Sequence, residues 1–207
     1  NILNSELNNN SHIYMIKTKD RIAAFFMVNW CEDLTVENHK LVYLGLSCAE
    51  QKTERKKLAS RVYFNFTFEA YNYQKEKQTK LLLYGTTATP LILLSLPKIW
   101  DDVKPLLNGS YSPIDERIIN EIKSVKGFTA FSDTHPFVLK KVKPFSNYST
   151  IEEKRMKVIE ENLEINTFKK LDIYENRGDR LLIMCKIPSL EKIQILKEKL
   201  YSIHAKN

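Results

Sequence analysis

Hydrophobic and polar residues alternate along the first part of the chain in a pattern typical of β-strands. Alternating runs cover residues 12–18 and 22–30, and a charged turn separates them, so the sequence predicts a β-hairpin. A polar connection is expected over residues 32–40. Residues 41–48 are apolar at nearly every position, which predicts a strand buried on both faces at the centre of a sheet.

The next segment, residues 52–80, carries two conflicting periodicities. Apolar residues recur at helical spacing, but Val62, Phe64, Phe66 and Phe68 also alternate as they would in a strand. Because neither glycine nor proline interrupts the segment, its length favours a long helix. A short buried strand at 81–85 would complete a strand–helix–strand unit.

The remaining chain alternates helices and strands. A loop through Thr86 and Thr87 should lead to a helix capped by Thr89. The later elements expected are a helix at 114–125 ending at Gly127, a strand pair within 128–142, a helix at 150–171, a strand at 180–187 and a helix at 189–205 capped by Ser189. This order predicts an α/β fold, with a mixed central sheet and helices on both faces.

The expected organisation is a disordered arm (1–11), a core (12–127) and an α+β C-terminal part of the same domain (128–207). The chain has 207 residues, of which 43% are hydrophobic, so it can bury a sizeable core. No apolar run approaches the roughly 18–20 residues that span a bilayer. We therefore expect no membrane segment.

Charge and cysteine content narrow the choice of partners. A formal net charge of +7 and a pI near 9.1 favour anionic partners. Because basic residues are interleaved with acidic ones, a dedicated nucleic-acid-binding protein is less favoured. Three widely spaced cysteines, Cys31, Cys48 and Cys185, offer neither a zinc motif nor a disulfide framework, which favours a reducing, cytoplasmic setting.

The order hairpin, central strand, basic loop, long helix, strand and helix over residues 12–105 resembles the core of the GNAT acetyltransferase superfamily. In that family, acetyl-CoA binds between the strand before the basic loop and the strand after the long helix. The CoA pyrophosphate sits on backbone N–H groups at the start of the helix, where unpaired donors and the positive end of the dipole favour an anion. The corresponding loop here is Gln51–Ala59.

The resemblance implies a set of site residues at the carboxyl ends of these strands. Those that would contact the cofactor are Leu46, Cys48, Gln51, Arg55, Lys56, Lys57 and Thr87. Read alone, Cys48 is expected to be a small buried residue. Glu50 and Asp33, with Glu32, are the carboxylates expected nearest the acceptor cleft, where one would deprotonate an amine.

The function that this resemblance implies is transfer of an acyl group from acetyl-CoA or another acyl-CoA to an amine. However, the loop contains no glycine, and Ser95 and Leu96 stand where many members carry a catalytic tyrosine. A catalytically inactive α/β module acting in protein interaction or assembly is therefore the alternative. Nucleic-acid binding by the aromatic residues of 63–73 is a second alternative, and core packing explains the same residues. His135, between Thr134 and Pro136, is expected to serve a turn.

Overall fold

The computed structural model describes residues 7–50, 57–142, 154, 156–158, 161 and 166–201, without the side chain of Glu32. The chain forms two compact units, Asn1–Leu83 with Lys186–Asn207, and Tyr84–Cys185. Across the described residues, seven strands of a mixed sheet combine with helices, which confirms the predicted α/β class. The boundary between the units falls within one strand, and the last helix belongs to the first unit.

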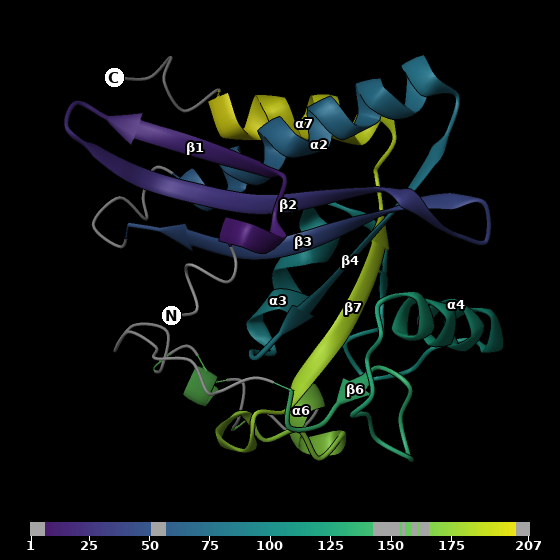
Figure 1. Ribbon diagram of the computed structural model, residues 1–207. Coiled ribbons are helices and arrows are strands. Elements are labelled where there is room, and N and C mark those ends of the chain that lie inside the picture. Colours follow the sequence, from purple (N-terminus) through teal and green to yellow (C-terminus); the bar gives the residue numbers. More distant parts are fainter. Residues whose placement is uncertain are drawn as a thin grey trace. The chain divides into compact units, whose positions relative to one another are not determined.

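In the first unit, three strands form an antiparallel sheet with two helices over one face (Figure 1). The elements are β1 (His12–Thr18), β2 (Arg21–Val36), β3 (His39–Ala49), α2 (Leu58–Lys77) and α7 (Leu190–Tyr201). The predicted hairpin and long helix are confirmed. The strand predicted at 41–48 is present, but it is not buried on both faces, because Leu46 and Cys48 are exposed. The two helices pack together through buried Phe64, Ile193 and Leu200.

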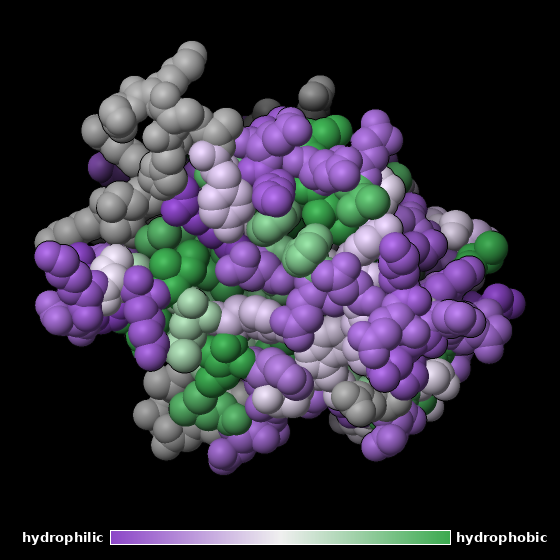
Figure 2. Space-filling model, turned by 90° about the horizontal axis from the view of Figure 1, so that it is seen from above, coloured by the Kyte–Doolittle hydropathy of each residue, from purple (hydrophilic) through white to green (hydrophobic). Residues whose placement is uncertain are grey.

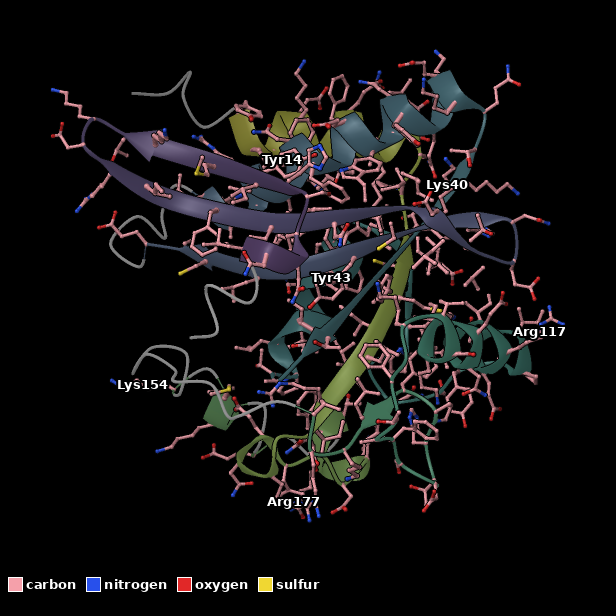
Figure 3. The ribbon with its side chains drawn as sticks, viewed as in Figure 1. Tyr14, Lys40, Tyr43, Arg117, Lys154 and Arg177 are labelled. Atoms are coloured by element: carbon pink, nitrogen blue, oxygen red, sulfur yellow. The ribbon has the colours of Figure 1, made fainter. Side chains whose placement is uncertain are left out.

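The register of the sheet assigns each side chain to one of its two faces. Tyr14 pairs with Phe26, and Phe26 pairs with Ser47, so these three side chains share a face. That face meets α2, because the Ser47 and Tyr63 hydroxyls lie 2.6 Å apart and Tyr14 packs edge-on against an α2 ring. Figure 3 shows Tyr14 on the α2 side of the sheet and Tyr43 on the other side.

The predicted polar connection over residues 32–40 is wrong, because the hairpin continues through it. β2 reaches Val36, and β3 begins at His39 after a two-residue turn. Both turn residues, Glu37 and Asn38, have positive φ (48° and 62°), as the tight turns that match strand twist require. The pairing register with β3 shifts between Cys31 and Thr35, which accommodates the acidic residues within the strand.

The predicted disordered arm is wrong for the residues just before β1. The Asn29 side chain donates to the Asn9 carbonyl (2.7 Å), and the Trp30 N–H donates to Ser11 Oγ (3.0 Å). The Asn10 side chain lies so close to Gly45 that an added Cβ would be 2.6 Å from Asn10 Oδ1. Glycine at position 45 therefore lets this segment lie against β3. Residues 1–6 are outside the described part of the chain.

The second unit surrounds strand β7, which lies between β4 and β5 and also pairs with β6. The strands are β4 (Lys80–Thr87), which begins in the first unit, β5 (Asp101–Lys104), β6 (Val138–Leu139) and β7 (Arg180–Lys186). The helices and 3-10 turns are α3 (Leu91–Ser95), η2 (Leu96–Lys98), α4 (Pro113–Val125), α6 (Thr167–Lys170) and η3 (Glu175–Arg177). Strand β5 has no counterpart in the sequence-based prediction.

Local hydrogen bonds explain where several helices begin. The Leu91 N–H donates to Thr89 Oγ1 (3.2 Å) and the Lys192 N–H to Ser189 Oγ (3.3 Å), which confirms both predicted caps. A reciprocal capping box between Ser112 and Asp115 starts α4. Half of the helix predicted at 150–171 lies outside the described residues. Residues 154, 156–158 and 161 are helical, but Asn166 is not, and it caps a separate short helix, α6.

Candidate functional site

The N-terminus of α2 is the element on which the expected anion site depends. Lys57 precedes the helix in a left-handed conformation (φ 48°), and its side chain caps none of the helix N–H groups. The first turn of the helix contains no acidic residue. The first N–H groups of a helix have no partner within it, so this end of α2 presents donors and a positive dipole end without an acidic side chain of its first turn beside them. Gln51, Arg55 and Lys56 lie outside the described residues.

Leu46 and Cys48, at the carboxyl end of β3, are both exposed. The prediction that Cys48 is buried is wrong. Cys48 pairs with Phe25, which pairs with Met15, and this row lies on the face of the sheet away from α2. The thiol is therefore accessible, whereas those of Cys31 and Cys185 are buried.

Glu50 follows β3 and forms an ion pair with Arg21, the first residue of β2. Its Oε1 lies 3.0 Å from Arg21 Nη1, and its N–H donates to the Ala23 carbonyl (2.8 Å). Glu50 thus lies at the same end of the strand as Cys48. Sequence reasoning missed Arg21, because a charged residue in a hairpin turn gives no sign of what it will pair with.

Asp33 is not brought close to Glu50. It is exposed on β2, ten positions beyond Ala23, the residue that binds the Glu50 N–H. At about 3.3 Å per strand residue the two carboxylates lie roughly 30 Å apart. The sequence-based pairing of these acids at one cleft is therefore wrong, and only Glu50 lies near the end of β3.

Thr87 lies at the end of β4 in the second unit and is nearly buried. Its hydroxyl accepts the Thr89 N–H (3.1 Å) and donates to the Thr89 carbonyl (3.2 Å). These bonds fix the turn into α3 and use the hydroxyl as donor and acceptor. The predicted loop at Thr86 and Thr87 is strand instead.

The aromatic residues of α2 serve the core. Phe64 and Phe66 are buried, and the Phe26 and Tyr63 rings pack edge to face with centroids 4.7 Å apart. Figure 2, which views the molecule from above, shows hydrophobic patches interspersed among hydrophilic residues. Core packing thus accounts for most of the aromatic residues that suggested base stacking.

Neither similarity to known proteins nor a common type of site assigns a function to the chain. Neither protein-family models, nor curated proteins, nor solved structures give a match to the chain. Within the described residues, no three His, Cys, Asp or Glu side chains are grouped as metal ligands would be. None of the helices described is both long and apolar enough to cross a membrane.

His135 has the turn role that the sequence predicts. It is buried between the Tyr111 and Phe137 rings. Its Nε2 lies 2.9 Å from the Gly109 carbonyl, and its Nδ1 accepts the Phe137 N–H (3.3 Å). An acceptor at Nδ1 and a carbonyl at Nε2 require the neutral tautomer with the proton on Nε2.

The geometry at His135 predicts acid sensitivity of the second unit. Burial lowers the pKa of His135 below its ordinary value of 6.5, and Lys123 adds to this, against the opposing effects of the Gly109 hydrogen bond and Glu116. At a pH between the folded and unfolded pKa values of His135, the unfolded chain binds more protons than the folded chain. The stability that the neutral, buried His135 contributes is therefore complete above about pH 6.5 and is lost as the pH falls through the folded pKa. Urea denaturation at pH 7.5 and 5.5 should show a drop in stability that is smaller in His135→Gln. His12→Gln, at an exposed histidine, is the control and should keep the wild-type drop.

Proposed function

We propose that the protein is an acyl-CoA-dependent N-acyltransferase with a GNAT-like core. The observation that carries this proposal is the start of α2, which has no side-chain cap from Lys57 and no acid in its first turn. It follows a central strand and a basic loop, in the order on which the resemblance rests. A diphosphate bound there would accept hydrogen bonds from the helix N–H groups and gain from the helix dipole.

Basic residues before the helix add charge to this anion site. By their place in the sequence, Arg55, Lys56 and Lys57 would repel the positive end of the helix dipole, and this repulsion would cost stability in the absence of an anion. A bound diphosphate would turn the repulsion into attraction. The arrangement therefore supports a dianionic or more highly charged ligand over a neutral one.

The end of β3 would hold the reacting part of the cofactor. There the amine attacks the thioester carbonyl, the new C–N bond forms as the C–S bond breaks, and the CoA thiolate takes up a proton released by the amine. A strand N–H near Leu46 to Cys48 would stabilise the developing oxyanion. Glu50 is the carboxylate at this end of the strand and would relay the amine proton, directly or through water.

Binding of acetyl-CoA, measured by calorimetry, tests the anion site. Reversing the charge in Lys57→Glu should weaken binding by about tenfold or more, because charge-assisted hydrogen bonds contribute about 1.5–3 kcal/mol. Lys75→Glu is the matched control, since it makes the same change in the last turn of the same helix. It should bind as the wild type does. No heat and no thermal stabilisation at millimolar acetyl-CoA would refute the proposal.

The exposed thiol supplies a readout of the same ligand at the strand end. Iodoacetamide should alkylate Cys48 much faster than the buried Cys31 and Cys185, as mass spectrometry of the native protein can show. Saturating acetyl-CoA should slow alkylation of Cys48. Calorimetric binding without such protection would place the ligand elsewhere and contradict the role of β3.

An exposed apolar face favours a protein-interaction role as the second candidate. Ile13 and Met15 of β1 are about 40% and 45% exposed, on the face of the sheet away from α2. If the protein binds no acetyl-CoA but associates with another protein, and Met15→Asp abolishes that association, the interaction role is supported over acyl transfer.

A further inference from the structure

The second unit contains a cavity of about 300 Å³ that the proposed acyl transfer does not use. Its walls are Thr86 near the end of β4, the segment 127–130 that follows α4, Leu139 of β6, and Lys141 and Val142 just after β6. Figure 1 shows these elements, α4 and β6, in the same part of the unit. Small-molecule sites in proteins begin at about this volume.

Backbone hydrogen bonds hold the two walls in place. The Lys140 N–H donates to the Ala130 carbonyl (3.0 Å), which ties one wall to the other. The Val142 N–H donates to the Gly178 carbonyl (3.0 Å), which anchors the far end of the second wall. The space is therefore bounded by fixed backbone, and a ligand would enter a site that is already formed.

Gly127 keeps one side of the cavity open. Its φ is +66°, which favours glycine, and a Cβ added there would meet no atom within 4 Å. The turn that ends α4 thus requires the residue that leaves this space unfilled.

Lys141 is the charged residue of the lining. Its backbone is left-handed (φ 53°), a conformation rare for residues other than glycine and Asn-like residues, and its N–H donates to Asp179 Oδ1 (3.3 Å). The neighbouring Lys140 pairs with Asp172 and Asp179. Within the described part of the chain, Lys141 has no such carboxylate partner for its own ammonium group, so its charge remains available to a ligand.

We propose that this cavity binds a small organic carboxylate with a short apolar chain. Phe128 and Val142 would contact the chain. Lys141 would pair with the carboxylate, and Thr86 and Thr129 offer hydroxyl groups. A phosphate fits less well, because its higher charge calls for more cations and N–H donors than one lysine and two hydroxyls supply.

An NMR titration of the whole ¹⁵N-labelled chain with hexanoate tests the proposal. Amide shifts should concentrate at Gly127, Thr129 and Val142, and hexanamide, the neutral isostere, should bind about tenfold more weakly or worse. Inorganic phosphate should leave these amides unshifted. Lys141→Met should lower the affinity for hexanoate to that for hexanamide. Lys169→Met, at an exposed lysine of α6, should leave the affinity for hexanoate unchanged.

Three results would overturn the site. These are shifts spread over the surface, equal binding of hexanoate and hexanamide, and phosphate binding at the same amides. Ala130→Phe should fill the cavity and abolish binding of both hexanoate and hexanamide. The chemical-shift dispersion of the amide signals reports whether that variant folds. Since Lys141→Met changes only a lining side chain, the charge test holds even if Ala130→Phe does not fold. Acetyl-CoA binding at α2 is a separate measurement and is independent of these outcomes.

Discussion

Phe66→Ala should destabilise the protein by about 4 kcal/mol, the largest loss expected from any single truncation in the first unit. Phe66 has no solvent exposure and joins both layers of that unit. Its ring lies 5.7 Å from Tyr14, 5.6 Å from Phe26 and 6.0 Å from Trp30, measured between centroids, in edge-to-face geometry. Truncation removes these contacts and leaves a cavity between α2 and the sheet.

Urea denaturation followed by Trp30 fluorescence, with Trp100 replaced by Phe in every protein compared, measures this loss beside the site of substitution. Phe68→Ala is the matched control, because it deletes the same atoms two residues later on α2. Phe68 is 47% exposed and stacks on Phe64, along the helix surface. It should lose far less stability than Phe66→Ala. Equal losses would mean that both rings are buried, as a strand alternating over this segment would require.

The long helix could be predicted from sequence because its apolar period agrees with its packing. Val62, Phe66 and Ala70 recur every four residues and are all buried, while Phe68 falls off this stripe and is exposed. The alternation that suggested a strand arises because Phe64 lies against a second helix, α7, rather than against the sheet. Because α2 packs against the sheet on one side and against α7 on another, its apolar residues alternate in sequence as those of a strand would.

The candidate site could be predicted only in part, because strand register and turn geometry decide which side chains meet. The turn at Glu37 and Asn38 has positive φ without glycine, so the sequence there reads as an open polar connection. Once the hairpin continues through it, Asp33 moves to the opposite end of β2 from Glu50. The exposure of Cys48 depends likewise on which face of the sheet α2 covers, and no local pattern specifies that.

Chemistry in the second unit was also hidden from sequence analysis, because it is made by segments distant along the chain. Asp179 receives the N–H groups of Lys141 and Tyr174, at 3.3 and 3.1 Å. Its Oδ2 also lies 3.3 Å from Lys140 Nζ and 3.4 Å from Arg177 Nη2. Asp179 thus connects the turn before β7 to Lys141 in the wall of the cavity. The pattern of charges along the sequence does not indicate this connection.

Asp179→Ala should cost about 3 kcal/mol, since it leaves two backbone N–H groups and two cations without the buried carboxylate that they share. Asp179 is 1% exposed, so water cannot replace the lost acceptor without opening the turn. Urea denaturation followed by Trp100 fluorescence, with Trp30 replaced by Phe in every protein compared, reports on this unit. Asp133→Ala, at an exposed aspartate of the same unit, is the control and should change stability little.

The loss at Asp179 should also depend on pH in a defined direction. Burial raises the pKa of this carboxyl, but the hydrogen bonds from Tyr174, Lys141 and Lys140 outweigh it, so the pKa lies below its ordinary value of 3.8. Above that value the unfolded and folded chains both carry the charge, and the stabilisation is complete. It is lost as the pH falls through the folded pKa, because the unfolded chain then binds a proton first. The difference in stability between wild type and Asp179→Ala should therefore be constant from pH 7 to 5 and shrink toward pH 3. A difference that stays the same at pH 3 would show that the side chain acts by packing rather than by charge.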